Sequence, residues 1–158
     1  IMSLFVGTVS LGLTTISGRE ASECASNLVS AIQHARTSTM GKEMVEIEIS
    51  QNSEGNIVAT EKVTTIDDGR NKSEYVSSEK IVGKKGFTLT YDLSGGGEGT
   101  ITEGNSLVLK FSRGQGSLEE TNGTDDVNKQ CVGITVSKAG KTRVIEIVPV
   151  TGRVAIEE

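Results

Sequence analysis

The first forty residues constrain this chain more than any other stretch, because they hold two helical patterns with no proline between them. Residues 1–17 carry no charge and are apolar nearly all round. Residues 19–40 are apolar on one side and polar on the other. We expect one continuous helix, which at 1.5 Å per residue would reach about 60 Å. A globule of 158 residues does not hold a helix of that length inside it, so half of it should project.

The front half of this helix is expected to lie among lipids or other helices. Its apolar run is near the lower limit for crossing a bilayer, where about 20 residues are usual, and residues upstream could complete the span. Gly7 and Gly12 are costly in an isolated helix but suit close packing between helices. A buried core helix is the alternative interpretation. The apolar side chains expected to make the contacts are Ile1, Leu4, Phe5, Val6, Val9, Leu11, Leu13 and Ile16.

The back half shows an amphipathic stripe. At 100° per residue its apolar residues fall on an arc of about 160°. Small residues in this arc would let a sheet approach closely, and Gly41 is placed to end the helix. Arg36 is the charged exception within the arc, and we expect its stem to lie along the surface with its head in water. The residues expected to pack between helix and sheet are Cys24, Leu28, Ala31, Ile32 and Ala35.

After Gly41 the period of the pattern changes from 3.6 to 2, which predicts strands. Val45, Ile47 and Ile49 alternate with polar residues, and turns rich in Gly, Asn and Asp separate further alternating segments. We expect seven to nine short strands within 43–158 and one or two antiparallel sheets. Residues 94–105 should be a flexible glycine-rich connection with room for a short strand, and 113–129 should be a loop.

The predicted fold class is therefore α+β, a long N-terminal helix packed on an antiparallel β domain of one or two sheets. Residues 1–18 form the projecting half of the helix. Residues 19–158 form the globular domain, which combines the amphipathic helix 19–40 with the β region 43–158.

Composition and motifs exclude several functional classes. The chain has a net charge of −5, and Lys84-Lys85 and Arg70-Lys72 are sparse, so a nucleic-acid partner is not expected. The glycine-rich run 94–104 lacks the Lys-Ser/Thr ending of a phosphate loop. A nucleophile–base set is missing from the sequence, so we expect no enzyme and no cofactor.

Candidate metal ligands are also scarce. Asp67-Asp68 and Asp125-Asp126 could hold a hard cation, but they lack the spacing of a calcium loop and fit plain Asx turns better. His34 lies on the polar edge of the helix with no second ligand at helical spacing, which predicts a solvated side chain. We therefore expect no metal site.

The two cysteines, Cys24 and Cys131, fit either an exported disulfide or two unrelated thiols. Cys24 belongs to the apolar face of the helix. Cys131 alternates against Val132 and Ile134, so on a regular strand it would point to the opposite side from them. A bond between the two cysteines would need Cys131 just before the strand or at a bulge.

Four segments resemble type IV pilins and type II secretion pseudopilins, especially the H-type minor pseudopilins. The body of the N-terminal pilin helix is similar to IMSLFVGTVSLGL. The helix and first strand of the H-type family are similar to NLVSAIQHARTSTMGKEMVEIEI, a phenylalanine-plus-glycine strand is similar to SLVLKFSRGQG, and the closing hairpin is similar to GKTRVIEIVPVTGRV. Together these segments touch most of the chain outside 60–105.

The resemblance implies a structural subunit of a filament, of the minor kind that primes assembly or sits near the tip. Such a subunit is held in the cytoplasmic membrane with its domain outside the cell or in the periplasm, and then packs against other subunits through its first helix. The cleavage glycine, the methylated aromatic residue and the glutamate of the family would lie upstream of Ile1. The rival hypothesis is a membrane-tethered adhesin or sensor module, in which the helix is only an anchor and a ligand pocket lies between the sheets or in the loops 94–129.

Overall fold

The computed structural model describes residues 2–41, 44–67 and 71–157, with side chains at 18–40, 44–65 and 72–157. These residues form one α-helix, one 3-10 helix and ten strands. Helix α1 spans Met2–Gly41, and the 3-10 helix η1 spans Val127–Lys129. The strands are β1 (Met44–Gln51), β2 (Ile57–Asp67), β3 (Asn71–Gly83), β4 (Thr88–Leu93), β5 (Glu98–Ile101), β6 (Leu107–Phe111), β7 (Leu118–Thr121), β8 (Cys131–Lys138), β9 (Lys141–Val148) and β10 (Arg153–Ile156).

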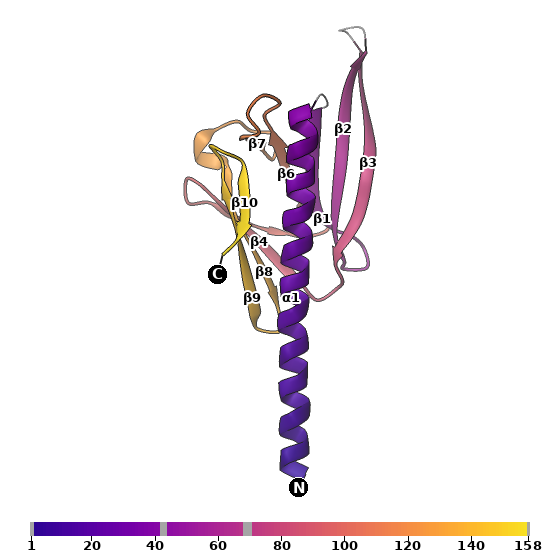
Figure 1. Cartoon of the computed structure of the whole chain (residues 1–158), viewed down its shortest axis with the longest axis vertical. Coiled ribbons are helices and arrows are strands. Elements are labelled where there is room, and N and C mark those ends of the chain that lie inside the picture. Colours follow the sequence, from indigo (N-terminus) through magenta and orange to yellow (C-terminus); the bar gives the residue numbers. More distant parts are fainter. Residues whose placement is uncertain (1, 42–43, 68–70, 158) are drawn as a thin grey trace.

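The strands form two antiparallel sheets of five strands each. Sheet A has the order β3-β2-β1-β6-β7, and sheet B has the order β10-β9-β8-β4-β5. Helix α1 lies against both, contacting β1, β3 and β6 of sheet A and β8, β9 and β10 of sheet B (Figure 1). The helix therefore packs against both sheets and contributes to one core that they share.

The predicted α+β class is wrong, because the fold is mostly β, with two five-stranded antiparallel sheets and one helix. The structure is partly consistent with that prediction, since a helix does pack on an antiparallel β domain. The strand count exceeds the seven to nine expected, because the segment 113–129, predicted as a loop, contains β7. Strand β5 is the short strand for which the prediction left room in 94–105. Strand β3 is the longest of the ten, with 13 residues.

The core is aliphatic and lies where α1 meets the two sheets. Val45, Ile47 and Ile49 are buried along β1, which confirms the period-two alternation there. The helix contributes a stripe of fully buried residues on the same side. The largest fully buried side chains are Phe111, Leu28, Ile32, Ile47, Ile49, Ile57, Leu89, Leu107, Leu109, Ile134, Ile145 and Ile147.

Candidate functional site

The seam between α1 and the sheets is built from small and aliphatic side chains. Cys24, Leu28, Ile32 and Ala35 are buried, and Ala31 is half-buried against the same cluster. Two further residues of the predicted arc, Ala21 and Ala25, are fully buried beside them. Because these small residues alternate with Leu and Ile at helical spacing, the sheets can approach the helix closely over several turns. The seam fixes the orientation of the whole helix on the β domain.

The turn between β8 and β9 marks the level at which α1 leaves the β domain. Lys138 Nζ, at the end of β8, lies 2.8 Å from Glu20 Oε2 on the helix. Arg143 Nε donates to Ser22 Oγ at 2.9 Å. Toward its N-terminus the helix continues past this turn with no sheet beside it (Figure 1). The β domain therefore holds only the back half of the helix.

The residues predicted for assembly belong to the projecting half. The backbone of Leu4, Phe5, Val6, Val9, Leu11, Leu13 and Ile16 is helical within α1. Their side chains, and the whole of Ile1, lie outside the described residues. Among the described residues, α1 does not combine the length and the hydrophobicity that a membrane-spanning helix requires.

Arg36 holds the C-terminal end of the helix to two loops, so its head is not simply in water as predicted but is half-buried and hydrogen-bonded. Its Nε donates to the carbonyl of Gly116 at 2.8 Å, and its Nη2 donates to the carbonyl of Thr151 at 3.0 Å. Gly116 lies in the loop between β6 and β7 of sheet A, and Thr151 lies in the turn between β9 and β10 of sheet B. One guanidinium thus joins the helix to both sheets. A lone charge inside the apolar arc was the sequence signal for this contact.

This contact requires glycine at the turn residue Gly152. Gly152 has a φ of +74°, and a Cβ there would collide with the carbonyl oxygen of Gly116. The absence of a side chain lets the two loops come together beneath Arg36. The backbone N–H of Leu118 also donates to the carbonyl of Pro149 at 2.8 Å, which joins the same two loops directly.

His34 is not a purely solvated side chain, because it pairs with a buried carboxylate. Its Nδ1 lies 2.8 Å from Glu61 Oε1 on β2. The histidine side chain is 70% exposed, whereas that of Glu61 is only 9% exposed. The pair borders a hollow of about 430 Å³ between α1 and the β2–β3 hairpin, also lined by Ser30, Ser77 and Ser78. A histidine–carboxylate pair is one part of a catalytic triad, but the hydrogen bonds found for the described side chains include none from these serines to the imidazole.

The cysteines do not form the candidate disulfide, since Cys24 and Cys131 are both free and buried. The side chain of Cys131 does reach the core. Leu93 pairs with Cys131 and Asp92 with Gly133, which leaves Val132 as the extra residue of a bulge. The bulge turns Cys131 to the same face as Ile134, the geometry that a bond would have needed.

Position along β8 explains why the two thiols remain apart. Cys24 and Lys138 line one hollow of about 410 Å³ at the end of β8, whereas Cys131 begins that strand. An eight-residue strand separates its ends by roughly 20 Å, while a disulfide requires Cα atoms within about 7 Å. Burial raises the pKa of each thiol from 9.0 to about 12. The charge of Lys138 opposes this rise at Cys24, and a backbone hydrogen bond with Gly133 opposes it at Cys131.

The acidic turns behave as structural caps where they are described. Asp126 Oδ1 accepts from the N–H of Asn128 at 3.0 Å and begins η1, which confirms the Asx turn predicted there. The first acidic pair is only partly described, since Asp68 lies outside the described residues. In the described part of the chain, no group of three or more His, Cys, Asp or Glu residues could hold a metal ion.

The outer face of sheet A carries a row of alternating charge. Lys62 of β2 pairs in register with Glu46 of β1, Glu46 with Lys110 of β6, and Lys110 with Glu120 of β7. Lys62 Nζ also lies 2.6 Å from Glu48 Oε2, and this hydrogen bond lowers the pKa of Glu48 and raises the pKa of Lys62. Opposite charges on neighbouring strands favour this register over a slipped one.

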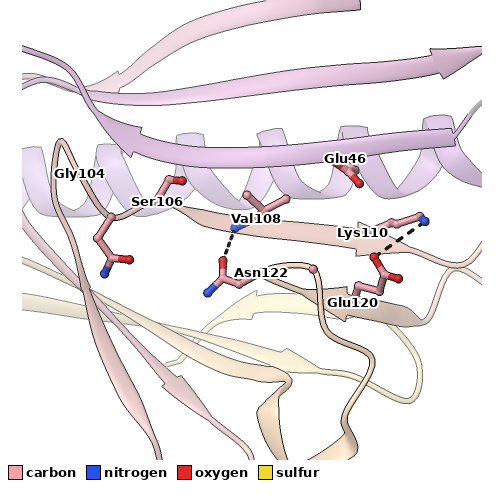
Figure 2. Close-up of a pocket in the computed structure, with 9 residues that line it drawn as sticks. Glu46, Gly104, Ser106, Val108, Lys110, Glu120 and Asn122 are labelled. Atoms are coloured by element: carbon pink, nitrogen blue, oxygen red, sulfur yellow. Dashed lines mark hydrogen bonds and ion pairs between the residues drawn. The ribbon is translucent and has the colours of Figure 1, made fainter. Parts of the chain in front are cut away.

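Beside this row lies a polar hollow of about 500 Å³ (Figure 2). Lys110 Nζ and Glu120 Oε2 are 3.9 Å apart on its floor. Asn122, with a φ of +51°, accepts from the N–H of Val108 at 2.8 Å through Oδ1 and donates to the hydroxyl of Tyr91 at 3.3 Å. Both polar groups of this amide are therefore engaged in hydrogen bonds within the fold, and polar side chains of both charges line the hollow.

No protein-family model, no curated protein and no solved structure matches this chain.

Proposed function

We propose that this chain is a structural subunit, of the minor kind, in a filament of the type IV pilus or type II secretion pseudopilus type. The observation that supports this most directly is the course of α1, which continues past the β8–β9 turn beyond both sheets (Figure 1). The sequence of that projecting half is apolar and uncharged. An apolar helix beyond its own domain needs partners supplied by lipid or by neighbouring helices.

The two halves of α1 divide the work in this proposal. The back half is locked to the β domain by the seam and by the contacts of Glu20 and Arg36 at its two ends. The front half packs against other pilin or pseudopilin subunits. The subunit is held at the cytoplasmic membrane before assembly, with the β domain on its outer side or in the periplasm, and the β domain then selects its neighbours.

Replacement of Leu11 by aspartate tests this mechanism. A carboxylate in the projecting half would have to be buried among apolar helices, which costs several kcal/mol when it is unpaired. We expect Leu11→Asp to abolish incorporation into filaments in cells that assemble them. The variant should keep the circular dichroism spectrum and urea midpoint of the parent chain, because Leu11 precedes the segment held by the sheets.

Two controls make the result specific. Leu11→Met keeps an apolar side chain and should assemble normally. Ser26→Asp places the same charge on an exposed position of the back half and should also assemble. Incorporation of Leu11→Asp at the parental level would contradict the proposal and would favour a tether that acts alone.

A further inference from the structure

Strand β3 is an unusually open sheet edge. It has 13 residues, whereas β7, β5 and β10, the other edge strands of the described sheets, have four each. Every residue from Lys72 to Ile81 is exposed, including Tyr75 and Val76, and the strand forms the outer border of sheet A (Figure 1). A long edge of this kind presents backbone N–H and C=O groups that another extended strand can pair with.

Only the first half of this edge is regular. Glu61 pairs with Ser78 and Lys62 with Val76, so Ser77 is the extra residue of a bulge. Bulges twist an edge strand and discourage further pairing. Residues 71–76 precede the bulge and pair with β2 without a shift of register. This segment, which we call the open edge, is where a strand can be added.

The charges of the open edge are complementary to themselves in antiparallel pairing. Lys72 lies opposite Ile66 and Glu74 opposite Thr64, so both belong to the outer face of sheet A, with Ser73 between them on the other face. If two copies meet with Ser73 opposite Ser73, Lys72 of each copy lies opposite Glu74 of the other.

Neighbouring registers are worse. A shift that centres the pairing on Glu74 sets two glutamates opposite each other, and one that centres it on Lys72 sets two lysines opposite each other. Like charges directly opposite are destabilising, and a slip that pairs Ser73 with Glu74 mixes the two faces of the sheet. The pattern Lys-Ser-Glu therefore favours this register over its two neighbours, and it makes the open edge complementary in charge to a second copy of itself.

We propose that two copies of this chain associate through their open edges, as an antiparallel β3–β3 pair with a twofold axis at Ser73. The contact is isologous and small, so the association is weak and reversible. It does not depend on the proposed filament function. The twofold axis points the two α1 helices in opposite directions, so within a polar filament the contact would join copies of different filaments.

Charge exchange in the full chain tests the pairing. Lys72→Glu sets two glutamates against each other at both ends of the overlap, and Glu74→Lys does the same with lysines. We expect each single variant to weaken dimer formation roughly fivefold to thirtyfold in sedimentation velocity at low salt in non-ionic detergent. The double variant Lys72→Glu/Glu74→Lys restores the complementarity and should dimerise like the parent. Association through α1 is common to all of them and does not respond to the exchange.

Cross-linking tests the register itself. Ser73→Cys places a thiol on the proposed axis and should give a disulfide-linked dimer under mild oxidation. Glu79→Cys, on the same strand but beyond the bulge, should remain monomeric, and the native thiols are buried. Circular dichroism verifies that each variant is folded. Equal association of the single and double charge variants, or equal cross-linking at the two positions, would overturn the proposal.

Discussion

Removal of the Arg36 guanidinium should measure how firmly the helix is tied to the two sheets. Its two hydrogen bonds are charge-assisted; the one to Gly116 is partly buried and the one to Thr151 is exposed. A partly buried bond from a charged donor contributes about 1.5–3 kcal/mol, and we assign the exposed one about 0.5 kcal/mol. We therefore expect Arg36→Ala to lower the free energy of unfolding by about 2–3.5 kcal/mol. For a chain of this size, where 1 kcal/mol shifts the Tm by about 2–4 °C, the Tm should fall by about 4–14 °C.

Thermal unfolding followed by far-ultraviolet circular dichroism would measure this loss, with urea titration as a second measure. Arg36→Lys keeps the charge and most of the stem but loses the planar fork, so it should recover only part of the stability. Arg19→Ala removes an exposed arginine from the same helix and should change the Tm by less than about 2 °C. If Arg36→Ala were no more harmful than Arg19→Ala, the argument that this side chain joins the helix to both sheets would fail.

The close packing at Gly99 and the burial of the two cysteines give further testable predictions. Gly99→Ala should destabilise the β4–β5 hairpin by about 1–3 kcal/mol in urea titration, because its Cβ would collide with the ring of Tyr91; Gly104→Ala, which meets open space, is the control, and equal midpoints would contradict this packing. The native thiols should resist iodoacetamide at pH 8 until the chain unfolds, and rapid alkylation of folded protein would show that they are not buried. Burial raises the pKa of both thiols in the folded chain from 9.0 to about 12, so the unfolded chain ionises first as the pH rises. The free energy of unfolding that the thiols contribute is therefore complete below pH 9 and should decline between pH 9 and 12. Alanine at both positions should reduce that decline.

Local patterns were sufficient where one period and one buried face determine the element. The helical stripe predicted the side of α1 that the sheets cover, and the alternation in Val45, Ile47 and Ile49 predicted β1. In each case a repeated apolar position outweighs any single residue, so the signal survives without knowledge of distant partners.

Local sequence patterns failed where the structure of a segment depends on a partner far away in the sequence. The polar segment Leu118–Thr121 became β7 because it pairs with β6, and its short sequence carries no clear alternation. Glu61 occupies an inward-facing position of β2, and only the arrival of His34 from the helix supplies its partner. The bulge at Val132 likewise depends on how β4 and β8 align. The α+β class was wrong for the same reason, since strands formed by long-range pairing were counted as loops.

The continuity of α1 has a mechanical consequence. The helix runs without a break from the projecting half to the end of the seam, and proline, the usual cause of a kink, is absent from it. A pull on the projecting half along the helix axis would therefore load the seam in shear, with the contacts of Glu20, Arg143 and Arg36 strained together. Resistance to such a pull depends on many contacts breaking at once, whereas a sideways pull would open them one after another from the β8–β9 turn.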